Sequence, residues 1–278
     1  MLSINCNGRL LSFHHPVVMG IINVTPDSFY SGSRHKQVDE ILRTAEQMLQ
    51  DGATMIDVGG QSTRPGSQRI DADDELNRVM PAIEAIVKAF PSCIVSVDTF
   101  YSKVARHAVE TGAGIVNDVS AGSIDENLIS TVAELKVPYV LMHMQGDPQT
   151  MQQNPVYNNV MLDVFDFLNF KIKQLQEAGI NEIIIDPGFG FGKTIQHNFQ
   201  LLAGLSFFKQ LGKPVMLGLS RKATIYKTLD ITADKALNGT TVLHTISLLN
   251  GANILRVHEV KEAVEAVRLV SAYKKEQW

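Results

Sequence analysis

Short apolar runs recur along the chain and constrain the fold more than any other feature. The segments between them have helical periodicity; in the last one, Val264, Val267 and Val270 recur at the spacing of one helix face. Strand-like and helix-like segments therefore alternate from residue 17 to the end of the chain. The eight apolar runs are 17–23, 54–60, 93–99, 114–120, 138–144, 182–188, 214–220 and 252–259.

This alternation predicts a closed (β/α)₈ TIM barrel. Near-continuous apolar strands are typical of a parallel sheet that is buried on both faces, and eight strand–helix units are the number that closes a barrel. An open, doubly wound α/β sheet has the same alternation, but the even count and the missing nucleotide fingerprint favour the barrel. No Pro/Gly/Ser-rich linker interrupts the chain, so we expect one domain over 17–278, preceded by an N-terminal extension over 1–16 with a hairpin signal at Asn7-Gly8.

The glycine-rich stretch 183–194, "IIIDPGFGFGKT", resembles a phosphate-binding loop only superficially. The P-loop position that requires a glycine N–H holds Pro187, which has no N–H. Gly188, Gly190 and Gly192 are also spaced G-x-G-x-G, which is not the dinucleotide pattern. What remains is Asp186 at the exit of a buried strand, followed by a turn with little side-chain bulk. This arrangement leaves room for a flat ligand beside one carboxylate.

Composition limits the classes of partner. The chain has 278 residues with a net charge of −4 and no run of lysine and arginine, so it lacks the footprint of a nucleic-acid binder. No apolar run is long enough to span a bilayer and the N-terminus has no signal-peptide pattern, so we expect no membrane partner. Cys6 and Cys93 lie far apart, which predicts free thiols and a reducing, cytoplasmic setting.

Polar side chains occupy the carboxyl end of nearly every apolar run. A barrel gathers these ends around one mouth, where the active sites of such enzymes lie. An Asp after a strand is also a common cap of the following helix, and this alternative stays open for Asp57 and Asp98. A capping role does not suit Asp186, because Pro187 and glycines follow it in place of a helix. The strand-end residues are Asn23, Asp57, Asp98, Asn117, His143, Asp186, Ser220, Arg256, His258 and Glu259.

These residue types predict a ligand with two unlike ends. Asp98, Asn117 and Asp186 can bind the edge of a heterocycle, whereas arginines match phosphate oxygens. The remaining histidines have no zinc-ligand spacing. A Mg²⁺ ion held by the substrate's phosphates and one amide oxygen, which Asn23 could supply, is compatible with this inventory. The cations of the predicted mouth are Arg64, Arg221, Lys222, Arg256 and His258.

Eight motifs together resemble the dihydropteroate synthase family. They occur in the family's order and spacing, and they extend from Gly20 to Val260. The motifs are "NVTPDSF" (23–29), "GGQSTRPG" (59–66), "VDT" (97–99), "ND" (117–118), "MHMQG" (142–146), "DPGFGFGK" (186–193), "SRK" (220–222) and "RVHEV" (256–260).

The resemblance implies a barrel enzyme of folate synthesis, usually a homodimer, that joins 6-hydroxymethyl-7,8-dihydropterin diphosphate to p-aminobenzoate and releases diphosphate. It implies that Asp98, Asp186, Lys222, Arg256 and His258 are catalytic. By position, the pterin would bind Asp98, Asn117, Met142, Asp186 and Lys222. The diphosphate would bind Asn23, Thr63, Arg64, Arg256 and His258, with Mg²⁺ at Asn23, and p-aminobenzoate would bind Phe29, Thr63, Pro65, Phe191 and Ser220.

The predicted chemistry is an SN1-like displacement. An aryl amine is already neutral near pH 7, so the harder step is the departure of diphosphate from the methylene carbon. Mg²⁺, arginines and a histidine stabilise charge on the leaving oxygens, and the negative charge of Asp186 favours the pterin cation that remains.

Three positions depart from the family pattern. Gln61 replaces a common glutamate, the first loop reads "SFYSGSRH", and Ala223 replaces a frequent serine that Thr224 or backbone N–H groups could substitute. These departures concern loop behaviour and the affinity for aminobenzoate or sulfonamides, which inhibit this family. Two rival hypotheses are a pterin-binding methyltransferase module and a catalytically silent pterin-binding paralogue. The complete diphosphate set and the motifs "STRPG" and "SRK" favour the synthase.

Overall fold

The structure is a computed structural model, and it describes residues 2–24, 34–61, 68–146, 151 and 155–276. Strands and helices alternate along most of this length. The strands are β1 (Ser3–Cys6), β2 (Arg9–Ser12), β3 (Val17–Asn23), β4 (Met55–Gly59), β5 (Ile94–Asp98), β6 (Ile115–Asp118), β7 (Tyr139–Met142), β8 (Ile183–Asp186), β9 (Met216–Leu217) and β10 (Ile254–Val257). The helices are α1 (Arg34–Gln50), α2 (Ala72–Ala89), α3 (Ser102–Thr111), α4 (Leu128–Leu135), α5 (Val160–Glu177), α6 (Ile195–Ala203), α7 (Ala223–Thr228), α8 (Leu237–Leu249) and α9 (Val260–Lys275), with 3₁₀ turns η1 (Leu205–Leu211) and η2 (Ala233–Lys235).

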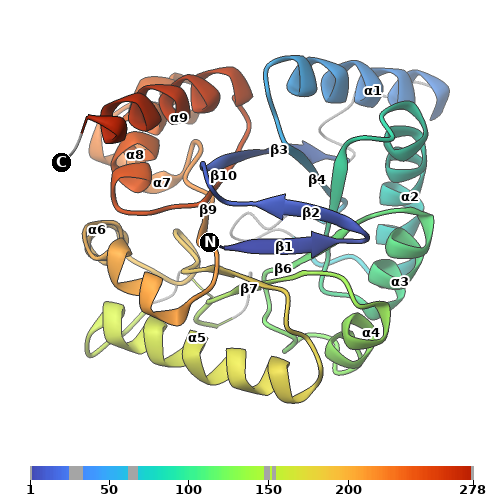
Figure 1. Cartoon of the computed structure of the whole chain (residues 1–278), viewed down its shortest axis with the longest axis horizontal. Helices are drawn as coiled ribbons and strands as arrows, with labels where there is room; N and C mark the ends of the chain where they lie inside the picture. Colours follow the sequence, from blue (N-terminus) through green and yellow to red (C-terminus); the bar gives the residue numbers. More distant parts are fainter. Residues whose placement is uncertain (1, 25–33, 62–67, 147–150, 152–154, 277–278) are drawn as a thin grey trace.

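The eight strands β3 to β10 form one parallel sheet that curves into a barrel (Figure 1). Their order is β8-β7-β6-β5-β4-β3-β10-β9, and each pairing is parallel. A parallel bridge between Ile185 and Val215 joins the two edges, with the Ile185 N–H donating to the Pro214 carbonyl at 2.9 Å. The TIM-barrel prediction is therefore confirmed, and the open sheet is excluded. The seventh apolar run, 214–220, contributes only the two residues of β9 to the sheet.

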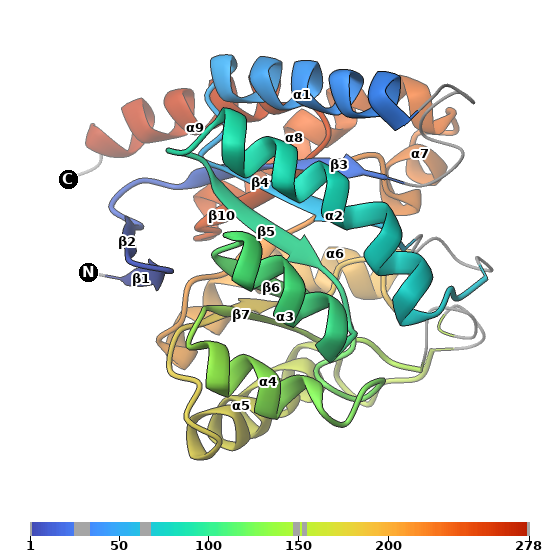
Figure 2. The ribbon, with the colours of Figure 1, turned by 90° about the vertical axis from the view of Figure 1, so that its right-hand side faces the viewer.

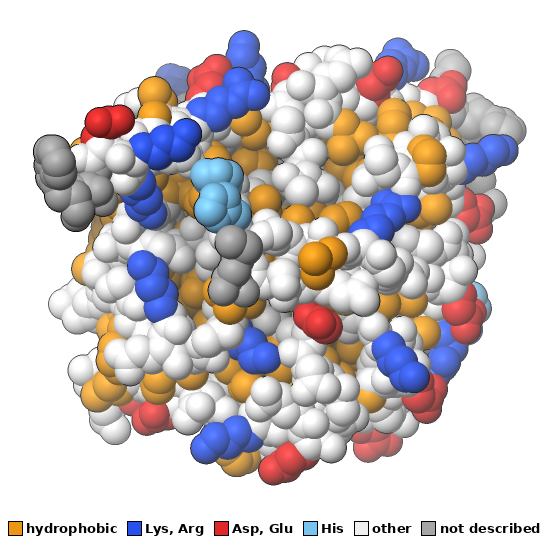
Figure 3. All heavy atoms as spheres, viewed as in Figure 1, with side chains coloured by type: hydrophobic (Ala, Val, Ile, Leu, Met, Phe, Trp, Pro, Cys, Tyr) orange, Lys and Arg blue, Asp and Glu red, His pale blue; other side chains and the backbone are white. Residues whose placement is uncertain are grey.

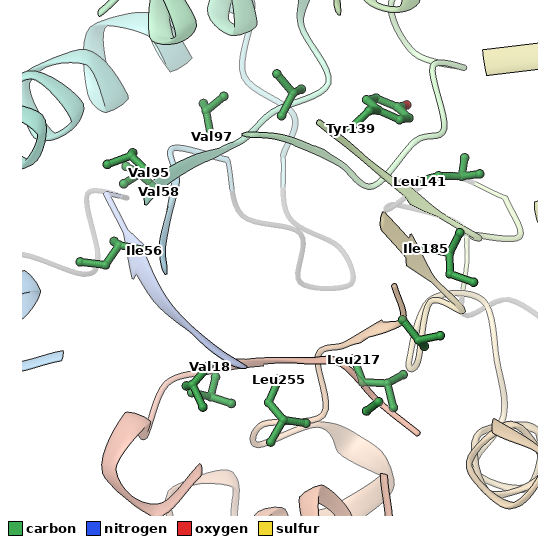
Figure 4. Close-up of a cluster of buried hydrophobic side chains, with 14 of the residues drawn as sticks. Val18, Ile56, Val58, Val95, Val97, Tyr139, Leu141, Ile185, Leu217 and Leu255 are labelled. Atoms are coloured by element: carbon green, nitrogen blue, oxygen red, sulfur yellow. The ribbon is translucent and has the colours of Figure 1, made fainter. Parts of the chain in front are cut away.

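The main core lies between the strands and the helices. Alternate strand residues such as Ile56 and Val58, or Val95 and Val97, are buried and point outward from the ring of strands (Figure 4). This is the face against which the helices pack, as the period of two in a strand requires. The residues between them, such as Asp57, consequently point into the barrel.

The N-terminal strands β1 and β2 form an antiparallel hairpin. Asn7 and Gly8 at its turn have φ values of 50° and 84°, which is the backbone of a two-residue hairpin loop. Ile4, Cys6, Leu11 and Phe13 pack against the first residues of the barrel strands, including Met55 and Ile94. Figure 2 shows the hairpin at the end of the barrel opposite to the arrowheads of the strands. The hairpin therefore covers the amino end of the barrel and leaves the carboxyl end for a site.

Charged side chains of both signs share one face of the molecule, and the two cysteines are not bonded to each other. On the face shown in Figure 3, lysine and arginine side chains are spread among acidic and uncharged ones. Cys6 and Cys93 are both buried free thiols. Among the described residues, no helix combines the length and the apolar character that crossing a membrane requires.

Candidate active site at the carboxyl ends of the strands

A hydrogen-bond network joins four predicted strand-end residues inside the barrel mouth. Arg256 donates through Nε to Asp57 Oδ2 and through Nη2 to Asp98 Oδ2, each at 2.6 Å. Asn117 Nδ2 also donates to Asp57 Oδ2, at 2.9 Å. The four residues come from β10, β4, β5 and β6, so side chains that are distant in sequence converge as predicted.

Strand register explains this convergence. Asp98 and Asn117 are paired residues on neighbouring strands, and Gly59 is paired with Asp98 on the other side. Asp57 and Arg256 each lie between two outward-facing core residues, so both side chains point inward. The helix-cap alternative for Asp57 and Asp98 is wrong, because Asp71 caps α2 and Tyr101 occupies the N-cap position of α3.

Burial and ion pairing shift the pKa values of Asp98 and Arg256 in opposite directions. Burial raises the pKa of Asp98 to about 7, although the Arg256 guanidinium opposes the shift. Burial also acts to lower the pKa of Arg256, but attraction to Asp57 and Asp98 outweighs it and the pKa is raised. Arg256 is therefore always a cation, and its pairing with Asp98 opposes the effect of burial on that carboxyl group.

Asp186 lies beneath a tight backbone turn, as the glycine-rich stretch predicts. Its carboxylate accepts a hydrogen bond from the Gly188 N–H at 2.7 Å, and Gly188 has a φ of 72°. A Cβ at Gly188 would lie 1.7 Å from the His143 carbonyl oxygen, so only glycine is accommodated there. Burial raises the pKa of Asp186, and the charges of Lys222, Lys193 and Arg256 oppose this shift. Asp186 is the last residue of β8 and Arg256 lies near the end of β10, so both belong to the carboxyl end of the same barrel, and the charge interaction between them agrees with this placement.

Lys222 connects the Asp186 turn to an aromatic ring. Its ammonium donates to the Phe189 carbonyl and lies 4.3 Å from the centroid of the Phe191 ring. Burial lowers the pKa of Lys222 to about 8, while Asp186 raises it. Met142 and Phe191 belong to one small apolar cluster with Phe100 and Val119. Met142, the predicted wall for the pterin, and Phe191, a predicted contact of p-aminobenzoate, are therefore adjacent.

A second buried lysine, Lys193, was not among the residues predicted for the site. It is 3% exposed, and its ammonium lies 2.9 Å from both the Phe191 carbonyl and the His143 Nδ1. Burial lowers the pKa of Lys193 to about 7, and burial together with Lys193 lowers that of His143 to about 3. His143 is therefore neutral, and it helps to hold the turn that follows β8 against the loop that follows β7.

Ser220 and His258 link two predicted subsites. Ser220 Oγ lies 2.9 Å from His258 Nδ1 and 3.1 Å from Glu259 Oε2, and Glu259 also pairs with Arg221. A hydroxyl has one hydrogen, so donation to the Glu259 carboxylate requires His258 Nδ1–H to donate to Ser220. This arrangement orients the His258 ring beside the predicted aminobenzoate contact.

The structure shows the surroundings of two departures from the family pattern, Gln61 and Ala223. Gln61 Nε2 donates to the Gln68 carbonyl at 3.1 Å while Gln61 Oε1 accepts from the Ile70 N–H at 2.9 Å. A glutamate could make only the second of these bonds. Thr224 is 2% exposed and its hydroxyl accepts from Asn198, so it lies inside the fold and does not replace the serine that Ala223 lacks.

Several predicted residues lie outside the described part of the chain: Phe29, Thr63, Arg64 and Pro65. Asn23 is described, at the last position of β3, where it pairs with Gly59. The described residues contain no cluster of three or more His, Cys, Asp or Glu that could hold a metal ion.

Comparisons with known proteins identify the family. Residues 19–258 match the model of a family described as pterin binding enzymes, so the chain belongs to that family. The dihydropteroate synthase of Escherichia coli K12 is 43% identical over 95% of this chain and 94% of its own length, and that of Haemophilus influenzae is 41% identical over 98% of each. Within the pterin-binding enzymes, the chain is a member of the dihydropteroate synthases.

Solved structures agree at the level of the fold. Yersinia pestis dihydropteroate synthase in a sulfonamide drug complex superposes with a TM-score of 0.93 at 39% identity, covering 99% of this chain and 100% of that one. The Xanthomonas albilineans enzyme in complex with 7,8-dihydropteroate superposes with a TM-score of 0.89 at 38% identity, with the same coverage.

Proposed function

We propose that this chain condenses 6-hydroxymethyl-7,8-dihydropterin diphosphate with p-aminobenzoate at the mouth of the barrel, giving 7,8-dihydropteroate and diphosphate. The observation that supports this most directly is the joint presence of buried acids and cations in one mouth, where Arg256 bonds both Asp57 and Asp98. A ring with N–H donors and a polyanionic tail is the kind of ligand that such a mixed set recognises.

The pterin ring is assigned to the deeper part of the mouth. Asp98, Asn117 and Asp186 offer oxygen acceptors, and the Lys222 ammonium offers a donor beside them. Met142 is buried in the apolar cluster and provides a wall against the flat face of the ring. The turn after Asp186 has glycines at 188, 190 and 192, which leaves the floor free of side-chain bulk.

The diphosphate is assigned to the cations nearer the rim. Arg256 and His258 lie at the end of β10. The proposed set also includes Thr63 and Arg64, which lie outside the described residues. Asn23 would hold Mg²⁺ through its amide oxygen, and the ion would neutralise charge on the phosphate oxygens. Hydrogen bonds to charged groups contribute about 1.5–3 kcal/mol each, so a few of them account for much of the barrier reduction.

The proposed reaction is a dissociative, SN1-like displacement. The bond between the methylene carbon and the diphosphate oxygen breaks first, and its electron pair leaves with the diphosphate. The positive charge that remains is delocalised over the pterin ring, where an ionised Asp186 stabilises it. The neutral amine of aminobenzoate then forms the carbon–nitrogen bond and loses a proton. We assign aminobenzoate to Phe191 and Ser220, together with Phe29, Thr63 and Pro65, which lie outside the described residues.

A homodimer in a reducing, cytoplasmic setting completes the proposal. Helices α8 and α9 present exposed apolar side chains, including Val242, Leu249, Leu269 and Tyr273, and Leu229 follows α7 nearby. The buried free thiols of Cys6 and Cys93 suit a reducing compartment. Light scattering on the purified protein tests the dimer, since a monomer at micromolar concentration would contradict it.

Product formation tests the proposed activity. Purified protein with Mg²⁺, the pterin diphosphate and p-aminobenzoate should form dihydropteroate and diphosphate in equal amounts. Tight pterin binding without diphosphate release would instead favour a silent pterin-binding protein. Methyl transfer to a corrinoid protein from a methylated pterin would favour the methyltransferase alternative.

A further inference from the structure

Asp57 lies at the centre of the mouth network but below its surface. Its side chain is 0% exposed, whereas the Arg256 side chain above it is 20% exposed. The single oxygen Oδ2 accepts hydrogen bonds from both Arg256 Nε and Asn117 Nδ2. Asp57 therefore contacts one residue proposed for the diphosphate and one proposed for the pterin, while being too deep to contact the substrate itself.

We propose that Asp57 is a positioning residue that orients the Asn117 amide and the Arg256 guanidinium toward the two halves of the pterin diphosphate. This role rests on the proposed function of the mouth. It adds a residue that acts only through its two neighbours.

The Asn117 amide has two ends that only its hydrogen bonds distinguish. An amide has almost the same shape after a 180° flip, but the flip exchanges a donor group for an acceptor. The Asp57 carboxylate only accepts hydrogen bonds, so it selects the orientation in which Nδ2 faces Asp57. One N–H and the oxygen Oδ1 then keep fixed positions for a ligand. Without Asp57, both orientations of the Asn117 amide become available, so the protein binds the pterin ring less tightly.

The Arg256 guanidinium is held in a defined plane. Nε is bonded to Asp57 and Nη2 to Asp98, so two separate carboxylates fix that plane. Neither of these two bonds uses Nη1, so this nitrogen stays available to an anion. Holding a long side chain in place before the ligand arrives reduces the entropy that binding must otherwise remove.

Charge and positioning predict opposite results for Asp57 variants. A carboxylate beside Arg256 weakens the attraction of the cation for an anion, so charge alone predicts that any neutral replacement tightens diphosphate binding. Asp57→Asn removes the charge but keeps an oxygen that can accept both hydrogen bonds. Asp57→Leu keeps the number and branching of the side-chain heavy atoms and removes both the charge and the oxygen. Positioning therefore predicts that these two variants differ.

The test is calorimetric binding of two probes to the full chain: 6-hydroxymethylpterin, which has the ring without the diphosphate, and inorganic diphosphate with Mg²⁺. We expect Asp57→Leu to weaken the binding of both probes by about tenfold or more, the effect of losing a hydrogen bond to a charged group. Asp57→Asn should stay within about threefold of the wild type or bind diphosphate more tightly. The KM for p-aminobenzoate should change by less than about threefold in both.

Equal losses in the two variants, or wild-type affinity in Asp57→Leu, would overturn the inference. Within the Asn117→Ala background, Asp57→Leu should lower hydroxymethylpterin affinity by less than about threefold, because its effect passes through Asn117. Full additivity would contradict it. A wild-type protein that binds neither probe would instead contradict the proposed function.

Asp57→Asn is the arm that does not depend on the folding of Asp57→Leu, because it keeps the shape of the side chain and an oxygen that can accept from both Asn117 and Arg256. A loss of about tenfold or more in the affinity of the folded Asp57→Asn variant for either probe would overturn the inference.

Discussion

Arg256 Nε lies 2.6 Å from Asp57 Oδ2, although 199 residues separate the two in sequence. The bond crosses the barrel mouth between strands that are not neighbours, because β3 lies between β4 and β10. It shows how the closed sheet turns scattered strand-end residues into one site. Variants in and around this mouth therefore test what the site does and how it is held.

Arg256→Ala should lower kcat/KM for the pterin diphosphate by at least about tenfold, or about 1.4 kcal/mol of transition-state stabilisation. The variant removes the cation assigned to the diphosphate and leaves the buried Asp57 and Asp98 without it. Arg43→Ala, at an exposed position of α1, is the matched control and should retain wild-type kinetics. An active Arg256→Ala enzyme would mean that the diphosphate binds elsewhere.

Activity should fall on the alkaline side as Lys222 loses its proton. Burial lowers the pKa of Lys222 to about 8, so the cation that binds the pterin is present below that pH and is lost above it. We expect kcat/KM to decline as pH rises through about 8. Lys222→Arg, whose side chain stays protonated, should shift the decline to higher pH. An alkaline limb that is unchanged in this variant would assign it to another group.

Glu75→Gln should stabilise the protein at alkaline pH. Burial raises the pKa of Glu75 from 4.5 to about 8, and Thr99 donates its hydroxyl hydrogen to the side chain. Between these two pKa values the folded state binds a proton that the unfolded state does not, so stability falls as pH rises through that window and levels off above it.

Thermal unfolding of Glu75→Gln at pH 6 and pH 8.5 measures this effect. The gain in Tm over the wild type should be larger at pH 8.5, by at least about 2 °C, which corresponds to roughly 1 kcal/mol in a domain of this size. Glu84→Gln, exposed on the same helix, should show no such difference. An equal gain at both pH values would mean that Glu75 is not protonated in the fold.

Gly188→Ala should abolish pterin binding, because its Cβ would lie 1.7 Å from the His143 carbonyl oxygen. Gly179→Ala is a matched control, since Gly179 also has a positive φ, of 93°, but a Cβ there meets nothing within 4 Å. The control isolates the backbone cost of about 1 kcal/mol in stability and should bind pterin normally. Comparable pterin affinity in both variants would show that the turn after Asp186 is not the floor of the site.

The sequence was sufficient to predict the barrel and much of its mouth. Eight apolar runs with helical segments between them specify the strand count, and Asp186 could be assigned to the mouth because no helix follows it directly. For Asp57 and Asp98, a cap and a ligand have the same local pattern, and only the tertiary contact with Arg256 decides between them.

Other features depend on packing between distant loops. The contact of Lys193 with His143 joins residues 50 apart, and nothing near either one signals it. The burial of Thr224 against Asn198 has the same cause, since it depends on how α6 and α7 meet. The hydrogen bond that Gln61 donates to the Gln68 carbonyl could not be predicted, because it forms only when the fold brings these two residues together.

The most direct test compares kcat/KM for the pterin diphosphate in the wild type and Asp186→Asn, with Asp166→Asn on the exposed side of α5 as the control. The asparagine keeps the shape of the side chain and removes the negative charge that we propose stabilises the pterin cation. We expect a loss of at least about tenfold in Asp186→Asn and none in the control. Full activity in Asp186→Asn would contradict the assignment of the barrel mouth as the catalytic site.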